Sequence, residues 1–292
     1  MKVVSQGAQL TTPTSGGQVN DGANPQTNEN VLENRDNFAP PKKRDWWAKE
    51  FQTLVALGES TTAGGWSSNR ERAWAHRLAG FINDFQRIPV QLVNVGIGGN
   101  LISQHSPAYE HSGKPAANMR LEPHVFRHHP DLLIISYGLN DSRGATPLDL
   151  FSDEMKSMLD QIQQQISPLI VLLGPYYVIG FERYGPHFNK ASLSILHQFN
   201  NAISNIATER DCLFVDILSA YGNANWLVHH DGVHANDLGH QIVANKIFEV
   251  LATNCSGLGN ETRELEKHIP HWRDESVLRQ DAGTKDSTLG AI

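Results

Sequence analysis

The sequence predicts an α/β fold: a three-layer α/β/α sandwich around a five-stranded parallel sheet with strand order 2-1-3-4-5. Short apolar runs alternate along the chain with longer segments of helical period. That rhythm is typical of parallel strands joined by crossover helices. Crossovers of this kind are right-handed, and 2-1-3-4-5 is a common order for five such strands.

Five apolar runs are the predicted strands. Each is short and rich in Val, Leu and Ile, as expected for strands covered by helices on both faces. In chain order they are Thr53–Leu57, Val90–Val95, Leu132–Tyr137, Leu169–Leu173 and Leu213–Ile217.

Five segments between and after these runs have helical period. Thr146-Pro147 followed by Asp149 suits a helix start, and Asn236 has the side chain of an N-cap. The predicted helices are roughly Arg72–Phe85, Met119–Arg127, Leu148–Ile166, Ala191–Ala207 and Asn236–Ala252.

Composition divides the chain into one domain and two ends. Of its 292 residues, 39% are hydrophobic and 19% charged, which suffices for one sizeable core. We expect a disordered N-terminal arm over 1–44, one globular domain over 45–256 and a polar C-terminal tail over 257–292. Both ends are polar and have few large apolar side chains to offset the entropy of ordering.

Charge and hydropathy exclude several classes of partner. The net charge is −7 and the Lys and Arg residues are dispersed, so we expect no nucleic acid. No apolar segment is long enough to span a bilayer, and Val3-Val4 is too short for a signal peptide. We therefore expect no membrane partner and a cytoplasmic location by default, while export and oligomeric state stay open.

Four short polar segments are predicted to meet at one rim. In open parallel sheets, ligands bind at the carboxyl ends of the strands. Ser60 follows the first predicted strand, Gly99 the second and Asn140 the third, whereas His234 directly precedes the last helix. The topology thus gathers residues that are far apart in sequence.

The residue types at this rim suit acyl transfer. A serine hydroxyl is a weak nucleophile at neutral pH and needs a base, for which the imidazole of His234 is suited. Asp231, three residues earlier, can accept a hydrogen bond from the other ring nitrogen. Ser60 alone also fits a helix-capping serine, and His229, His230 and Asp231 also fit a surface loop or a metal site. We expect no metal, because the cluster offers adjacency rather than convergent ligands.

Three donors can stabilise a developing oxyanion at the same place. They are the backbone N–H of Ser60, the backbone N–H of Gly99 and the side-chain amide of Asn140. Ordinary turn roles for the glycine and the asparagine remain open, and Gly98 beside Gly99 leaves the donor open by one residue.

The four segments resemble the four sequence blocks of the SGNH hydrolase superfamily, also called GDSL-like esterases and lipases, in the same order. The resemblance covers residues of about 51 to 253. It implies the three-layer fold, ester hydrolysis and no cofactor. It also implies Ser60 as nucleophile, Gly99 and Asn140 as oxyanion donors and His234 as base, with Asp231 as its acid. The blocks are Gly58-Glu59-Ser60, Asn94 to Asn100, Gly138-Leu139-Asn140-Asp141 and Asp231 to His234.

Two details of this resemblance concern single residues. The first block reads Gly-Glu-Ser where the family more often has Gly-Asp-Ser. Gly99 is preferred to Gly98 because it lies five residues after Asn94, as the family glycine does.

The substrate is less constrained than the chemistry. The long aromatic and polar segment 175–189 follows the fourth strand and is expected to line the pocket. Trp66, Tyr177 and Trp226 offer flat surfaces for a sugar ring or an acyl chain. We expect an esterase that acts through an acyl-enzyme and releases a short acyl group, such as acetyl, from a carbohydrate or another polar alcohol. A thioesterase or lysophospholipase, a non-catalytic carbohydrate-binding relative and a metal phosphohydrolase are the alternatives.

Overall fold

The computed structural model describes residues 42–270 and 275–276. The predicted arm therefore lies outside the described residues except for 42–44, and so does most of the predicted C-terminal tail beyond 270. The domain boundaries at 45 and 256 stay a prediction.

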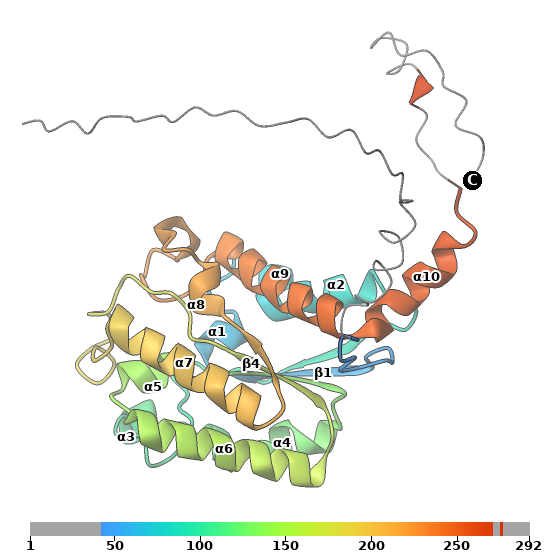
Figure 1. The fold of residues 1–292 in the computed structure, drawn as a ribbon. Helices are drawn as coiled ribbons and strands as arrows, with labels where there is room; N and C mark the ends of the chain where they lie inside the picture. Colours follow the sequence, from blue (N-terminus) through green and yellow to red (C-terminus); the bar gives the residue numbers. More distant parts are fainter. Residues whose placement is uncertain (1–41, 271–274, 277–292) are drawn as a thin grey trace, which may run out of the picture. The chain divides into compact units, whose positions relative to one another are not determined.

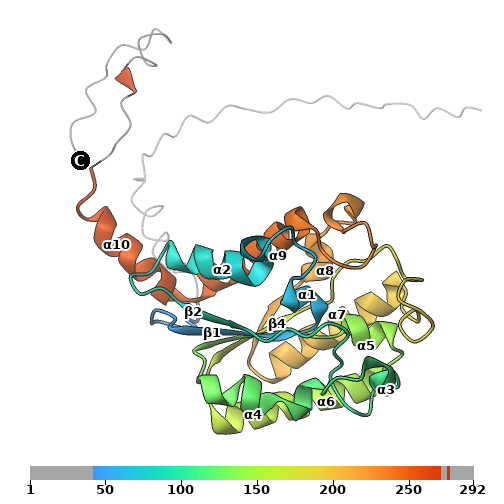
Figure 2. The same cartoon turned by 180° about the vertical axis from the view of Figure 1, so that it is seen from behind.

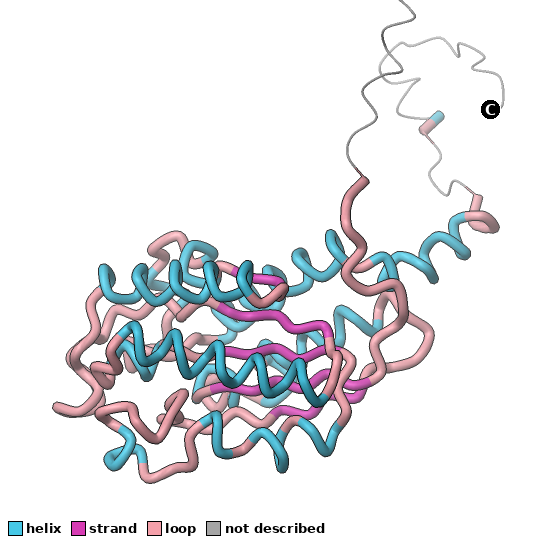
Figure 3. The backbone as a smooth tube through the Cα atoms, turned by 60° about the horizontal axis from the view of Figure 1, so that its bottom comes forward, coloured by secondary structure: helices cyan, strands magenta, loops and turns pink. Residues whose placement is uncertain are grey.

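A five-stranded parallel sheet with order β2-β1-β3-β4-β5 forms the centre of the fold. This is the flavodoxin-like order, so the predicted fold class and strand order are confirmed. β1 pairs with both β2 and β3, and Leu54 lies opposite Leu132 in the register of β1 and β3. Figure 3 shows the strands side by side between the helices. The strands are β1 Thr53–Gly58, β2 Gln91–Asn94, β3 Leu132–Ser136, β4 Leu169–Leu173 and β5 Leu213–Val215.

Alternate residues of the strands point to two separate hydrophobic cores. Leu54 and Ile134 belong to the core under one face of the sheet, whereas Val55 and Ile135 belong to the other. Helices α2 and α9 cover the first face, and α6 with most of α7 covers the second (Figures 1 and 2). These helices are α2 Trp74–Asn83, α6 Leu148–Gln165, α7 Leu193–Glu209 and α9 Asp237–Asn254.

Short helices and turns fill the connections between strands and long helices. The predicted helix over Met119–Arg127 is broken into several turns. Pro123 has no N–H to donate to the carbonyl of Met119, and Val125 has non-helical φ and ψ of −127° and −64°. The short helices are α1 Ser60–Ala63, α3 Tyr109–Ser112, α4 Leu121–His124, α5 Leu139–Arg143, α8 Ile217–Ala220 and α10 Asn260–Glu266. The 3-10 turns are η2 Arg70–Arg72, η3 Ala117–Met119, η4 Phe126–His128, η5 Asn225–Leu227 and η6 Ser256–Gly259.

The segment before β1 is tied to the segment after α9. The Trp46 N–H donates to the Asn254 carbonyl at 2.9 Å, and the Gly257 N–H donates to the Trp47 carbonyl at 3.0 Å. Because β1 starts here and α9 ends here, this junction lies at the amino edge of the sheet.

Among the described residues, none of the helices combines the length and the apolar character that crossing a lipid bilayer requires.

Candidate active site

Ser60 lies directly beyond the carboxyl end of β1, as the first residue of α1. The turn that carries Ser60 needs glycine at position 58. A Cβ on Gly58 would lie 2.2 Å from Thr62 Oγ1 and 2.7 Å from the Ser136 carbonyl oxygen. Ser60 is only 5% exposed, so its hydroxyl faces a cavity rather than open solvent. As the first helical residue it also has a backbone N–H without an intrahelical acceptor.

The structure brings Ser60, His234 and Asp231 together in one line. Ser60 Oγ lies 2.8 Å from His234 Nε2, although the two residues are 174 positions apart. His234 Nδ1 lies 2.6 Å from Asp231 Oδ2. A neutral imidazole that donates from Nδ1 to the carboxylate has its Nε2 lone pair free to accept the serine proton.

The loop that carries His234 is fixed by its own backbone. Val228 and Ala235 form an antiparallel bridge, and the His229 N–H donates to the His234 carbonyl at 2.7 Å. Asp231 Oδ1 accepts from the backbone N–H groups of Val233 and His234, at 2.9 and 3.1 Å. The carboxylate is therefore oriented by the same turn that presents the imidazole.

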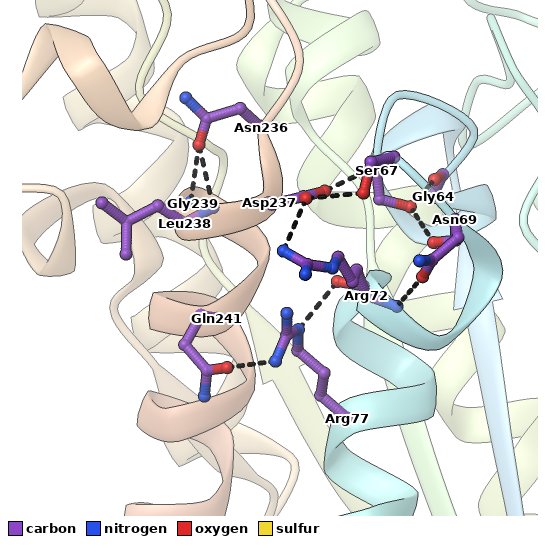
Figure 4. Close-up of polar contacts among 11 residues, drawn as sticks. Gly64, Ser67, Asn69, Arg72, Arg77, Asn236, Asp237, Leu238, Gly239 and Gln241 are labelled. Carbon is purple, nitrogen blue, oxygen red and sulfur yellow. Dashed lines mark hydrogen bonds and ion pairs between the residues drawn. The ribbon is translucent and has the colours of Figure 1, made fainter.

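The start of α9 is also tied to the segment that follows the nucleophile (Figure 4). Asp237 accepts from the backbone N–H and the hydroxyl of Ser68, both at 2.7 Å, and from Arg72 Nη1 at 3.0 Å. Asn236 caps the helix by accepting from the N–H groups of Leu238 and Gly239, as its sequence position predicts. These contacts hold the two loops that carry Ser60 and His234 in a fixed relation.

Burial and hydrogen bonds set the charge states of the histidine and the aspartate. Burial lowers the pKa of His234, and Asp231 opposes this only in part, so the imidazole is neutral at neutral pH. Burial would raise the pKa of Asp231, but hydrogen bonds from Tyr184, Val233 and His234 outweigh it and hold that pKa well below its usual range. An ionised carboxylate beside a neutral imidazole is the state that general-base catalysis requires.

Two aromatic side chains enclose this pair. The indole of Trp66 stacks on the imidazole of His234, with ring centroids 3.4 Å apart and planes 7° from parallel. Tyr184 donates its hydroxyl to Asp231 Oδ2 at 2.7 Å, and its ring meets the His234 ring edge-on. Burial, followed by the neighbouring Asp231 carboxylate, raises the pKa of Tyr184 to about 12, so its hydroxyl stays a donor. The sequence pointed to the segment of Tyr184 but not to this residue.

The predicted oxyanion donors face the same cavity as Ser60. Asn140 donates one amide hydrogen from Nδ2 to the Asn100 carbonyl at 3.1 Å, which leaves the second hydrogen for a ligand. Gly98 and Gly99 both line the cavity, and no described residue accepts a backbone N–H from either. Gly99 has a φ of +69°, which favours glycine.

Two buried carboxyl groups hold these donors from behind. Glu59 accepts from the backbone N–H groups of Gly138 and Asn140, at 2.9 and 3.1 Å, and burial raises its pKa. Asp141 accepts from the Ile102 N–H and from the hydroxyls of Ser106 and Thr146, and burial raises its pKa to about 7. Both carboxyl groups join the segment after β3 to neighbouring loops.

The cavity over Ser60 has a volume of about 360 Å³. Trp66 lines it, whereas the side chains of Tyr177 and Trp226 do not. The Tyr177 hydroxyl donates to Asn225 at 2.9 Å and its ring packs near Tyr221. Trp226 is 74% exposed. The prediction that these two residues bind substrate therefore has no support from this cavity. The lining residues are Ser60, Trp66, Gly98, Gly99, Lys114, Asn140, Arg143, Tyr184, Phe188, Val233 and His234.

The alternative metal site that the sequence offers consists of His229, His230 and Asp231. His229 Nδ1 lies 3.5 Å from Asp231 Oδ1, and the rings of His229 and His230 are 3.9 Å apart. In the part of the chain that the structure describes, no three His, Cys, Asp or Glu side chains are arranged to hold a metal ion.

The sequence matches one known protein family. A model of the GDSL-like lipase/acylhydrolase family matches residues 56–242. No match appears among curated proteins.

Solved structures share the fold at low identity. Axe2, an acetylxylan esterase from Geobacillus stearothermophilus, is 21% identical, with 70% of this chain and 95% of that chain covered and a TM-score of 0.53. LAE5, an alpha/beta hydrolase enzyme from the metagenome of Lake Arreo in Spain, is 18% identical, with 71% and 97% covered and a TM-score of 0.55. Catalytic mutants of Axe2 in which a serine, an aspartate or a histidine is replaced by alanine match in the same way.

Proposed function

The chain belongs to the GDSL-like lipase/acylhydrolase family and is a carboxylic ester hydrolase, and from that premise we propose that it removes short acyl groups, above all acetyl, from a carbohydrate or another polar alcohol. We assign Ser60 as the nucleophile, His234 as the base and Asp231 as the residue that orients the base. The observation that carries this assignment is the line of contacts from Ser60 Oγ through both ring nitrogens of His234 to Asp231.

In the first half of the reaction, Ser60 Oγ attacks the acyl carbon while its proton passes to His234 Nε2. The carbonyl oxygen becomes an oxyanion that accepts hydrogen bonds from the Asn140 amide and from the backbone N–H groups of Ser60 and Gly99. The tetrahedral intermediate then breaks its bond to the alcohol oxygen, which takes the proton from His234 Nε2 and leaves as the free alcohol.

In the second half, water repeats the sequence on the acyl-enzyme. His234 takes a proton from the water as its oxygen bonds to the acyl carbon, and the same donors hold the new oxyanion. When the bond to Ser60 Oγ breaks, the serine recovers its proton from His234 and the carboxylic acid is released. Throughout, Asp231 keeps the proton on Nδ1 and stabilises the imidazolium that forms.

The size of the cavity supports a short acyl group. At about 360 Å³ it lies near the lower end of small-molecule sites, which leaves little room for a long acyl chain. The solved structures of similar fold include an acetylxylan esterase, which agrees with an acetylated carbohydrate as substrate. Trp66 at the cavity wall presents an aromatic surface, but its stacking on His234 gives it a positioning role as well.

Two alternatives from the sequence remain in competition with this proposal. A thioesterase or lysophospholipase would use the same serine, histidine and aspartate but would need room for a longer acyl chain. A carbohydrate-binding relative without catalysis would not need the aligned Ser60, His234 and Asp231.

The assignment of the nucleophile is tested by replacing Ser60 with alanine. We expect Ser60→Ala to lower the turnover of p-nitrophenyl acetate on the order of 10⁵-fold while leaving the circular dichroism spectrum unchanged. A fluorophosphonate probe should label the wild-type protein and not this variant. The matched control is Ser157→Ala, an exposed serine on α6, which should keep wild-type turnover and labelling. Turnover retained by Ser60→Ala would refute the assignment.

The acyl preference is tested with p-nitrophenyl esters and acyl-CoA thioesters of increasing chain length. We expect kcat/KM to be highest for acetyl and to fall as the chain grows beyond the size of the cavity. An optimum at long chains or on thioesters would favour the thioesterase or lysophospholipase. Failure of the folded protein to react with any ester or with the probe would favour the binding protein.

A further inference from the structure

The cavity over Ser60 has an uneven charge. Two of the described residues that line it are cationic, Arg143 and Lys114, and none of those lining residues is acidic. The whole chain carries a net charge of −7, so this concentration of positive charge runs against the average of the molecule. A substrate that enters the cavity therefore lies beside two positive charges.

Arg143 is a buried cation without an ionic partner. It is 1% exposed, lies three residues after Asn140 at the end of α5, and makes no ion pair with any residue that the structure describes. Its Nε and Nη2 donate to the carbonyls of Phe188 and Arg183, at 3.0 and 2.6 Å, while Nη1 is buried with no acceptor. Burying a guanidinium costs desolvation free energy that two carbonyl contacts offset only in part.

The two acidic groups that act electrostatically on Arg143, Glu59 and Asp231, make their hydrogen bonds with other residues. Glu59 accepts from backbone N–H groups at the start of α5, and Asp231 accepts from Tyr184, Val233 and His234. Tyr184 places its ring, not a charge, 5.7 Å from the Arg143 guanidinium carbon. Glu59 and Asp231 favour the charged form of Arg143 electrostatically, but neither makes a direct ion pair with its guanidinium.

Lys114 brings a second positive charge to the other predicted oxyanion segment. Its ammonium donates to the Gly98 carbonyl at 2.6 Å, and a Cβ on Gly99 would lie 3.3 Å from its Nζ. Lys114 itself is exposed, so its ammonium retains hydrogens for a ligand at the mouth of the cavity. Arg143 and Lys114 therefore lie next to the two segments that carry the proposed oxyanion donors, Asn140 and Gly99. The acyl group must lie between these segments.

We propose that the cavity selects esters whose alcohol part carries a carboxylate, such as an O-acetylated acidic sugar, with Arg143 and Lys114 as the residues that recognise the negative charge. The planar fork of a guanidinium matches a carboxylate, and Nη1 is the one nitrogen of Arg143 for which the described residues provide no acceptor. This inference rests on the proposed function, because it names the substrate class of the same site.

The test compares two substrates that differ only in charge. One is methyl 3-O-acetyl-glucuronoside, and the other is its uncharged primary amide. For the wild-type protein we expect kcat/KM to be on the order of tenfold higher for the acid than for the amide, and this preference should shrink as salt is added. Both substrates contain the same acetyl ester, so the ratio reports recognition of the charge rather than the chemistry.

Two substitutions assign the preference to the cations. Arg143→Gln and Lys114→Gln should each lower the ratio toward one, mainly through KM for the acid. Arg143 also holds the Phe188 segment, so its variant is checked by circular dichroism. The exposed Lys114 gives an independent variant if Arg143→Gln does not fold. Lys246→Gln, a partly exposed lysine on α9, is the matched control and should keep the wild-type ratio.

Each outcome bears on one proposal. A wild-type ratio of one or less, or a ratio that neither substitution changes, overturns the carboxylate preference while Ser60-dependent turnover of p-nitrophenyl acetate still supports the esterase. Absence of Ser60-dependent turnover on every ester overturns the proposed function itself.

Discussion

The imidazole of His234 is fixed on three sides. Nδ1 faces Asp231, Nε2 faces Ser60, and one ring face lies flat on Trp66. With both nitrogens engaged and rotation blocked by the indole, little orientational freedom is left to be lost when a substrate arrives. Trp66, expected from the sequence to bind substrate, thus also serves to orient the base.

The hydroxyl of Tyr184 gives a testable effect on the pH dependence of the rate. Burial holds the pKa of His234 below its ordinary value, so kcat/KM should rise with pH through that low pKa and reach a plateau by neutral pH. Tyr184→Phe removes a donor from Asp231 Oδ2, the oxygen that His234 also contacts. The carboxylate then stabilises the imidazolium more strongly, so the pKa of His234 rises and the acidic limb moves to higher pH.

The measurement is kcat/KM for p-nitrophenyl acetate across the acidic range. We expect the plateau for Tyr184→Phe to fall by less than about tenfold, because the three central residues stay in place. Tyr109→Phe removes a hydroxyl that contacts Met119 outside the cavity wall and should keep the wild-type limb. If the acidic part of the kcat/KM profile of Tyr184→Phe does not shift, or shifts to lower pH, this role of Tyr184 is contradicted.

At the scale of single residues, the sequence predicted which residues lie at the site better than it predicted the contacts that they make. Ser60, Asp231 and His234 could be singled out because strand ends and a three-residue spacing suggested them and the resemblance to the four family blocks implied their roles. Tyr184 could not, since it belongs to a loop whose path is set by tertiary contacts: the Gly180 N–H donates to the Gly232 carbonyl at 2.7 Å. The hydrogen bond of the Tyr177 hydroxyl to Asn225 is a further tertiary contact that the sequence did not predict.

Among the elements, the starts of two short helices carry the proposed nucleophile Ser60 and the proposed oxyanion donor Asn140. Glu59 is the residue before α1, and its carboxyl group accepts from the backbone at the start of α5. The two helices are thereby joined through one buried side chain. The departure from the more common Gly-Asp-Ser block therefore places a longer acid where its length is used to span two elements.

Replacing Glu59 tests this connection. Glu59→Ala leaves buried backbone N–H groups without acceptors, so we expect the free energy of unfolding to fall by about 1–3 kcal/mol. Because Asn140 is displaced from the developing oxyanion, kcat should fall by about tenfold or more while KM changes little.

Glu59→Asp is the conservative comparison. It keeps a carboxylate but shortens its reach to the start of α5, so it should recover only part of the lost kcat. Urea denaturation and steady-state kinetics on p-nitrophenyl acetate measure both effects. Equal kcat in the alanine variant and the wild type would show that Glu59 does not position Asn140.

Helix length explains which elements were predictable. The helices α2, α6, α7 and α9 have ten or more residues each, so their periodic apolar faces are visible in the sequence. The helices α1 and α5 have four and five residues, too few for a period to show. Their starts depend on contacts such as that of Glu59, which no local pattern encodes.

For the described molecule as a whole, the junction between the segment before β1 and the segment after α9 closes the fold. Gly257 packs so tightly there that a Cβ would lie 2.0 Å from the Lys49 carbonyl oxygen and 2.5 Å from its carbon. The sequence predicted a polar tail from this residue onward and gave no sign of the contact, because a glycine in a polar stretch has no hydrophobic pattern.

Adding one methyl group tests how much this junction contributes. Gly257→Ala must push two backbone segments apart, so we expect it to lower the free energy of unfolding by about 1–3 kcal/mol. Gly259→Ala is the matched control, since a Cβ there meets nothing within 4 Å and its φ is −93°. Urea denaturation of both variants compares them, and equal stability would show that the junction yields without cost.

The strand order was predictable at this scale because few topologies satisfy a right-handed chain of alternating strands and helices.

The junction at Trp46 and Asn254 has a practical consequence for handling the enzyme. It lies at the amino edge of the sheet, whereas the cavity over Ser60 lies at the carboxyl edge, where Ser60 follows β1. A surface or a fused module attached near Trp46 would therefore hold the catalyst from behind. Immobilised in this way, the domain would present the cavity over Ser60 to the surrounding solution.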